Sequence, residues 1–264
     1  MNRFVYIFIL AFLFSCTGKN RFPGPVSEKI LPEQVKLLEK LKLSNRDSSF
    51  TPGKNVGSTQ DFGRLSHFQD LYFEKKPEFN LVDFEKEWTE IAAEIEKSKL
   101  NFKDAKSWFG INGTLMQITG DAKYAEEMQK TLSNDFSPKN EAEYNEIEKL
   151  VAPYIFTKNV DHIHVNLFIP AEIQYEHTMH GKVKIRQETH FPDPEYMTVK
   201  FGMEERRYIE VFVRVPSRAE GATVTVKGVK YIAPPGDYAF IAKKWREGDV
   251  IEIHFPKSRK AAGL

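Results

Sequence analysis

The sequence predicts an α+β fold in which a few helices precede a C-terminal antiparallel β-sandwich. Between residues 162 and 256 apolar and polar residues alternate with a period of two, as in Val183, Lys184 and Ile185. This alternation is typical of strands that bury one face. Between residues 83 and 150 apolar residues recur at helical spacing instead. A second antiparallel sheet must cover the buried face of the strands, and this predicts a sandwich.

The beginning of the chain is typical of a bacterial lipoprotein signal. A short basic start is followed by an apolar run, Phe4 to Phe14, that is too short to span a bilayer. The run leads to Cys16, the only cysteine of the chain, and residues 13–16 resemble a lipobox. We therefore expect Cys16 to be lipidated and the protein to be anchored in the cell envelope. The alternative is an ordinary signal peptide with an incidental cysteine.

The next segments predict a tether, a helix and a loop. Small and polar residues with Pro and Gly follow Cys16, as in a flexible tether. Apolar residues at intervals after Ser27, with Pro32 near the start, predict a short amphipathic helix that ends at Leu43. The polar stretch that follows predicts a long loop. The expected division is a signal peptide at 1–15, a tether at 16–26, a helical part at 27–152 with its loop at 44–66, and a β-sandwich domain at 153–264.

Two helical hairpins are predicted between residues 83 and 150. Phe84, Trp88 and Ile91 fall at helical spacing, and we assign Trp88 to the core in preference to a sugar-binding platform. A second apolar pattern breaks at Gly120 and Asp121, which predicts the turn between two helices.

Several phrases in the last three fifths of the chain resemble glycoside hydrolase family 127 (GH127), whose best-known members are β-L-arabinofuranosidases. The matching phrases, which keep the order of the family, are residues 165–169, 183–189, 213–216, 222–228 and 245–253. A weaker similarity at residues 112–128 resembles a helix-turn-helix of the family's α/α barrel. The resemblance implies the family's C-terminal β-sandwich and a fragment of its barrel, and it assigns Trp245 to packing before the final strand.

The resemblance does not bring the family's chemistry with it. Retaining members are described as using a zinc-bound cysteine nucleophile, held among other cysteines and a glutamate. This chain has no cysteine after Cys16, and two helical hairpins are too few to close a barrel. The sequence therefore predicts no bound metal and no cofactor.

A different chemistry is conceivable at the end of the long loop. Arg64, His67 and Tyr72 lie close together in the sequence, with Ser66, Gln69 and Asp70 between them. An arginine binds a uronate carboxylate, and a histidine or tyrosine moves a proton. These residues are our candidate catalytic group for elimination at a uronate. The alternative is a solvated loop whose aromatic residues dock on the core.

The histidines and carboxylates of the predicted strands are weaker candidates. His162 and His164 share a face of one strand, yet they lack an evident third metal ligand, so we interpret them as surface or interface residues. His177 and His180 fall at a hairpin bend and are interpreted in the same way. Glu188 and Glu210 would suit an acid/base pair if they were close together.

Two aromatic residues near a proline-rich turn are candidates for carbohydrate contact. Phe191 and Tyr196 flank this turn, where either ring would be free to stack on a sugar.

Charge and composition limit the classes of binding partner that we expect. With 38 basic and 37 acidic residues the chain has a formal net charge of +1, so no overall field favours nucleic acid or an anionic lipid surface. The expected partners are an oligosaccharide or polysaccharide, and a membrane through the lipid anchor only. Two hypotheses remain: an enzyme that acts on plant or algal cell-wall glycans, by elimination or hydrolysis, and a non-catalytic remnant that binds glycan or supports a neighbouring enzyme.

Overall fold

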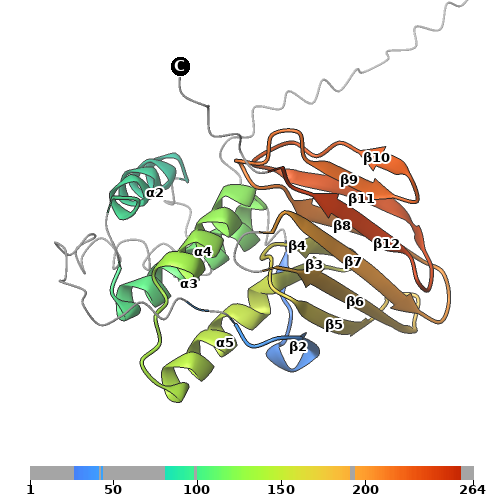
Figure 1. The fold of residues 1–264 in the computed structure, drawn as a ribbon, viewed down its shortest axis with the longest axis horizontal. Helices are drawn as coiled ribbons and strands as arrows, with labels where there is room; N and C mark the ends of the chain where they lie inside the picture. The colour runs from blue at the N-terminus through green and yellow to red at the C-terminus, as the bar shows by residue number, and fades with distance from the viewer. Residues whose placement is uncertain (1–26, 42, 44–80, 98–99, 191–193, 257–264) are drawn as a thin grey trace, which may run out of the picture.

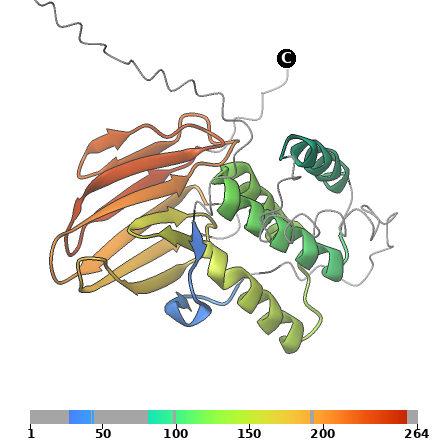
Figure 2. The same cartoon turned by 180° about the vertical axis from the view of Figure 1, so that it is seen from behind.

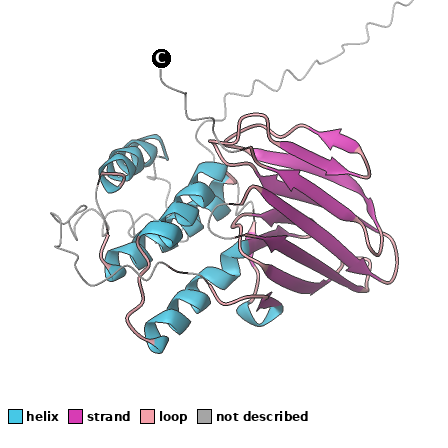
Figure 3. Cartoon of the chain, viewed as in Figure 1, coloured by secondary structure: helices cyan, strands magenta, loops and turns pink. Residues whose placement is uncertain are grey.

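The computed structural model describes residues 27–41, 43, 81–97, 100–190 and 194–256. Helices gather at one end of a β-sandwich (Figures 1 and 3), and this confirms the predicted α+β class. The helices are α2 (Leu81–Ile95), α3 (Phe102–Thr119), α4 (Ala122–Asn134) and α5 (Glu141–Ile155). The predicted boundary between residues 152 and 153 therefore falls inside α5. Among the described residues, no helix is long and apolar enough to cross a membrane.

The sandwich consists of two sheets, which Figure 2 shows from behind. The five-stranded sheet has the order β1 (Glu28–Lys29), β3 (Phe156–Asn159), β4 (His162–Val165), β8 (Arg207–Arg214) and β11 (Tyr238–Trp245). The seven-stranded sheet has the order β10 (Val229–Tyr231), β9 (Thr223–Val226), β12 (Val250–His254), β7 (Tyr196–Met203), β6 (Lys182–Thr189), β5 (Ala171–Glu176) and β2 (Val35–Leu37). Of these pairings, β4 with β8 is parallel and the others are antiparallel.

The period-two pattern decides which side chains lie between the sheets. On β6, Val183, Ile185 and Gln187 are buried, while Lys184 and Arg186 between them are exposed. Gln187 is the polar exception, and its Nε2 donates to the carbonyl oxygens of Leu167 and Ile169, at 2.8 and 2.7 Å. The inner faces of the sheets and the buried sides of the helices form one continuous hydrophobic core.

The amphipathic helix predicted for residues 27–43 is wrong. This segment forms β1, a 3₁₀ turn at Pro32–Gln34 and β2. Leu31 occupies the N-cap position of the turn and makes no side-chain capping bond. Apart from Pro32, the sequence therefore offers no residue that would stabilise the start of a longer helix. The segment instead adds an edge strand to each sheet, because β1 pairs with β3 and β2 pairs with β5. Backbone hydrogen bonds to existing strands outweigh a weak helical pattern here.

The helix pair forms as the sequence predicts. Asn101 caps α3 by accepting a hydrogen bond from the Asp104 backbone N–H at 2.9 Å. Gly120 ends α3 in the left-handed region, with φ of 70°, and its N–H donates to the Met116 carbonyl. Asp121 then caps α4. The predicted turn at Gly120 and Asp121 is therefore confirmed.

Trp88 lies in the helical core, as predicted. Its ring stacks on Trp108 with 5.9 Å between centroids, and its Nε1 donates to Asn112 Oδ1 at 2.9 Å. Trp88 and Trp108 are both buried.

A buried arginine joins the helices to the sandwich. Arg214 of β8 is 1% exposed, and its Nε donates to the Asn166 carbonyl oxygen at 2.6 Å. Its guanidinium also lies over the Phe168 ring, 4.1 Å from the centroid. Gln129 of α4 accepts the Phe168 backbone N–H at 2.9 Å and an Arg214 N–H at 3.4 Å. Because these bonds cross from α4 to the sheet, they orient the helical part against the strand ends.

Candidate functional site

A groove lies on the outer side of the seven-stranded sheet, at the end where β6 stops and β7 begins. Its volume is about 460 Å³, which lies within the range of small-molecule sites. The lining residues come from the end of β2, the start of β5 and both strands of the β6–β7 pair: Leu38, Glu39, Pro170, Arg186, Glu188, Thr189, His190, Tyr196, Met197 and Thr198. We call it the Tyr196 groove.

Tyr196 presents an open aromatic ring in this groove. The residue is 61% exposed, and its ring stacks on that of His254 with centroids 4.4 Å apart and planes 22° apart. Since one side of the Tyr196 ring packs on the imidazole, the orientation of the ring is held while much of it remains open to solvent. The ring is accessible to a ligand, and the carbohydrate contact predicted for Tyr196 stays a prediction.

Glu188 in the same groove is held as an ionised carboxylate. Its oxygens lie 2.6 Å from Lys200 Nζ and 3.0 Å from Arg186 Nε. The hydrogen bond from Lys200 lowers the pKa of Glu188, and the nearby positive charges act in the same direction. An ionised carboxylate accepts hydrogen bonds from hydroxyl groups but does not donate a proton. Glu188 is therefore suited to hold a ligand and unsuited to act as a general acid.

Thr189 lies at the rim of the groove but is itself a buried residue of β6. The residue lines the groove and is 9% exposed, and its Oγ1 is buried without a hydrogen bond. Thr189 has the same inward direction on β6 as Gln187, so this buried hydroxyl lies on the core side of the sheet and is not a ligand group of the groove.

The sequence alone did not single out Arg186, Thr189 or His190. Their position beside Tyr196 depends on the pairing of β6 with β7, in which Arg186 lies opposite Lys200 and Glu188 opposite Thr198. Alternation showed that Arg186 points outward. No sequence signal showed that Leu38, about 150 residues earlier in the chain, reaches the same groove.

Several predicted site residues lie outside the described residues. They are the lipidation candidate Cys16, the catalytic candidates Arg64, His67 and Tyr72, and the carbohydrate candidate Phe191. These assignments stay predictions of the sequence.

The hypothesis that Glu188 and Glu210 form an acid/base pair is wrong. Glu188 lies on β6 of the seven-stranded sheet, and Glu210 lies on β8 of the five-stranded sheet. The residues on either side of each glutamate are buried between the sheets, and side chains alternate along a strand. The two carboxylates therefore point outward, on opposite faces of the sandwich. The sandwich core separates them, and no single sugar residue reaches both.

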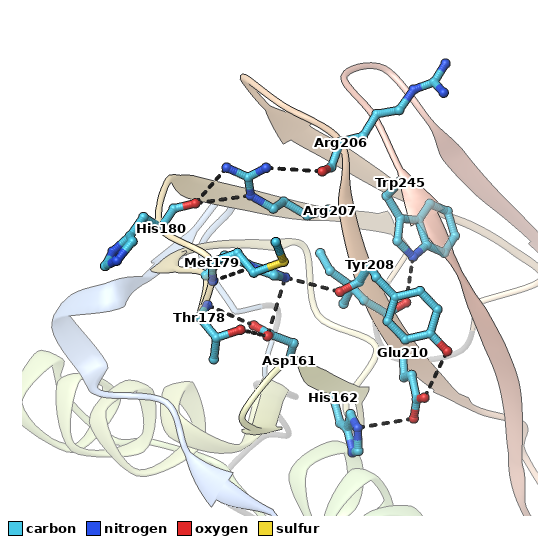
Figure 4. A network of polar contacts seen from close by, with 12 residues as sticks. Asp161, His162, Thr178, Met179, His180, Arg206, Arg207, Tyr208, Glu210 and Trp245 are labelled. Atoms are coloured by element: carbon cyan, nitrogen blue, oxygen red, sulfur yellow. Dashed lines mark hydrogen bonds and ion pairs between the residues drawn. The ribbon is translucent and has the colours of Figure 1, made fainter.

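The two histidines of β4 lie on the outer face of the five-stranded sheet, as their spacing predicts. His162 Nε2 is 3.2 Å from Glu210 Oε2, as Figure 4 shows. His164 is 7% exposed and stacks on Phe212, with ring centroids 4.5 Å apart. Within the described part of the chain, no group of three or more His, Cys, Asp or Glu side chains is placed to hold a metal ion.

The predicted hairpin bend at His177 and His180 is present between β5 and β6. His177 is buried, and its Nε2 lies 3.1 Å from the Tyr208 carbonyl oxygen and 3.4 Å from Asp161 Oδ2. Its Nδ1 accepts the Met179 backbone N–H at 3.1 Å. The contact of His177 with Tyr208 ties the hairpin to β8. Arg207 adds a second tie, because it donates to the His180 carbonyl oxygen, as Figure 4 shows. Both histidines thus belong to the structure of the hairpin.

The comparisons with known proteins agree with this fold. Residues 162–257 match the family model described as "Beta-L-arabinofuranosidase, GH127 middle domain". No curated protein matches the chain.

Solved structures show the same relation over more of the chain. A structure titled as a glycoside hydrolase aligns with a TM-score of 0.51 at 21% identity, over 58% of this chain and 32% of its own. A GH127 β-arabinofuranosidase aligns with a TM-score of 0.50 at 21% identity, over 58% of this chain and 31% of its own. A GH127 β-L-arabinofuranosidase from Geobacillus stearothermophilus T6 gives 0.49 at 22% identity, over 57% and 31%.

This chain spans about a third of the length of those structures. At 21–22% identity the structural likeness shows a shared fold and nothing about function. The family match covers the sandwich part of that fold. The family match confirms the resemblance to glycoside hydrolase family 127 over residues 162–257, and the solved structures show the shared fold over 58% of the chain.

Proposed function

We propose that this protein binds plant or algal cell-wall glycans in the breakdown of polysaccharides, and that the Tyr196 groove is the sugar contact. The observation that carries the proposal is the exposed, stacked Tyr196 ring beside the ionised Glu188 carboxylate. Sugars combine an apolar face of C–H groups with a rim of hydroxyl groups. An aromatic ring attracts the C–H face through its negative quadrupole, and a carboxylate accepts hydrogen bonds from the hydroxyls.

The relation to glycosidases supports the same class of ligand. The related structures are titled as a glycoside hydrolase and as GH127 arabinofuranosidases, which places arabinose-containing glycans first among the compounds to test. A pocket with one aromatic wall and a few polar groups is the usual form of a small-ligand site.

Tyr196→Ala is expected to weaken binding of an arabinan oligosaccharide by about two- to tenfold, since one aromatic stacking contact is worth about 0.5–1.5 kcal/mol. Isothermal titration calorimetry measures this change. Tyr196→Phe is the matched control, because it keeps the ring and removes only the hydroxyl, and it should bind nearly as well as the unmodified protein. Unchanged affinity in Tyr196→Ala, with its fold intact by circular dichroism, would exclude the groove as the sugar contact.

A catalytic step is a second proposal, which rests on the sequence alone. Elimination at a uronate would use Arg64 to hold the carboxylate and His67 or Tyr72 to move the proton. Turnover of a uronate oligosaccharide that His67→Ala and Tyr72→Phe both abolish would support it. Glycoside hydrolysis by Glu188 with Glu210 is excluded, because the carboxylates lie on opposite faces.

We also propose that the protein is held in the cell envelope by a lipid on Cys16, on the basis of the apolar run before it. Cys16→Ser is then expected to move the protein from the membrane fraction to the soluble fraction, which immunoblotting of the two fractions measures. Equal membrane retention of both forms would refute the anchor.

A further inference from the structure

The outer face of the five-stranded sheet carries a second surface of aromatic and polar side chains. On β8 the residues Ile209, Val211 and Val213 are buried between the sheets, so the residues that alternate with them point outward. The pairing of β8 with β4 and β11 places further side chains beside them. We call the resulting group the β8 face, and it consists of His162, His164, Tyr208, Glu210, Phe212 and Phe240.

Three rings of the β8 face form a row across the strands. His164 and Phe212 are neighbours in the pairing of β4 with β8, and their rings are nearly parallel, 11° apart, with centroids separated by 4.5 Å. Phe212 lies opposite Phe240 of β11, with 4.9 Å between ring centroids. Phe240 ends the row and is 48% exposed. An aromatic row that remains exposed at its end is a surface that a ligand or partner would cover.

A chain of polar groups runs beside this row. Glu210 accepts a hydrogen bond from the Tyr208 hydroxyl at 3.1 Å and lies 3.2 Å from His162 Nε2, as Figure 4 shows. The bond to the Glu210 carboxylate raises the pKa of Tyr208, which keeps the phenol protonated as a donor. The residue opposite Glu210 on β11 is Ala242, whose side chain ends at Cβ and is too short to cover the carboxylate. Tyr208 is 48% exposed, and the His162 side chain is 47% exposed.

We infer that the β8 face is a second carbohydrate-binding surface, in which a sugar ring packs against Phe240 and its hydroxyl groups bond to Glu210 and His162. The combination of aromatic rings with a carboxylate and an imidazole offers both an apolar contact and several donors and acceptors. Nucleic acid is disfavoured because the central charge of the face is a carboxylate. The inference rests on the proposed function only for the class of ligand, since it uses none of the residues of the Tyr196 groove.

Two sugar contacts on one sandwich have a measurable consequence. Tyr196 lies on the outer face of the seven-stranded sheet, and the β8 face lies on the outer face of the other sheet. The protein would therefore bind two glycan segments at once and hold a polysaccharide more tightly than a short oligosaccharide, because the second contact is made at high effective concentration.

The experiment compares the purified unmodified chain with four variants: Phe240→Ala, Glu210→Gln, Tyr196→Ala and the double variant Phe240→Ala/Tyr196→Ala. Titration calorimetry with a short arabinan oligosaccharide measures the number of sites, and a short oligogalacturonide serves as the acidic comparison. Ile232→Ala is the matched surface control, because Ile232 is 85% exposed and lies outside both surfaces. We expect two bound oligosaccharides per chain in the unmodified protein. Phe240→Ala and Tyr196→Ala should each weaken one of the two sites by about two- to tenfold, and the double variant should weaken both. Glu210→Gln should weaken binding at the β8 face by about tenfold, because it replaces a charged acceptor with a neutral one.

The outcomes separate the two surfaces. A single site that Tyr196→Ala alone weakens would overturn the β8 face and leave the Tyr196 groove. A single site that Phe240→Ala alone weakens would support the β8 face and overturn the groove. Binding of neither oligosaccharide would overturn both. Sedimentation of the unmodified protein as a dimer that Phe240→Ala converts to a monomer would show that the face is an interface between copies, which also overturns the inference.

Discussion

Trp245→Ala is expected to lower the free energy of unfolding by about 3–5 kcal/mol, the cost of emptying a fully buried aromatic site. Trp245 is 0% exposed and ends β11, and its ring stacks on Phe201 of β7 with centroids 3.9 Å apart. The ring therefore joins the two sheets directly. Its Nε1 also donates to the Ile209 carbonyl oxygen at 2.9 Å. Urea unfolding followed by circular dichroism measures the loss.

Trp245→Phe separates the contribution of ring packing from that of the indole hydrogen bond. A phenyl ring keeps most of the contact with Phe201 but leaves the Ile209 carbonyl without its donor. It should therefore cost less than Trp245→Ala, with about 1–3 kcal/mol arising from the unpaired oxygen. The exposed Ile232→Ala should stay within about 0.5 kcal/mol of the unmodified protein. A loss below about 1 kcal/mol for Trp245→Ala would contradict the packing role.

Acid is expected to destabilise the sandwich through His164, by about 2–3 kcal/mol between pH 7.5 and 4.5. Burial lowers the pKa of His164 from 6.5 to about 4, and the nearby His162 acts in the same direction. The folded protein therefore keeps this imidazole neutral, while the unfolded chain binds a proton at pH 6.5 and below. Stability from this residue is fully present above pH 6.5 and is lost as the pH falls toward 4.

The surroundings of His164 explain why its pKa is lowered and not raised. Its ring is enclosed by Phe212 and by Tyr238, whose centroid is 5.6 Å away. Its Nδ1 is buried with no hydrogen-bond partner among the described residues. A proton on this nitrogen would add a charge to an aromatic environment that has no acceptor for it.

His164→Phe is the control for this prediction, because it keeps a flat ring beside Phe212 and cannot titrate. Urea unfolding of both proteins at pH 7.5 and 4.5 gives two pH dependences, and their difference isolates His164 from the carboxylates that titrate in both. The unmodified protein should lose about 2–3 kcal/mol more than the variant. Equal losses would show that His164 is not held neutral.

The proposed glycan contact does not depend on a catalytic cysteine. Residues 162–257 match the GH127 middle-domain model, and the sequence has no cysteine after Cys16. A sandwich with the proposed sugar contacts would position a glycan without cleaving it, and the proposed elimination would need the separate group predicted at Arg64, His67 and Tyr72. Binding and turnover are therefore independent measurements for this protein.

Local sequence patterns determined most of the strands and helices. Val183 and Ile185 alternate with charged residues, and Gly120 followed by Asp121 ends one helix and begins the next. These signals act within a few residues, through side-chain direction and capping. They can therefore be recognised in the sequence before the tertiary structure is known. The family phrases added the sandwich topology, and Trp245 lies in the core as they imply.

The tertiary structure alone decided the sites and the role of the first described segment. Residues 28–37 became edge strands because β3 and β5 offered unpaired backbone groups, which a local pattern does not reveal. Glu188 and Glu210 look equivalent in the sequence, yet sheet membership places them on opposite faces. The Tyr196 groove and the β8 face likewise depend on strand register, because pairing between distant strands sets which outward side chains become neighbours.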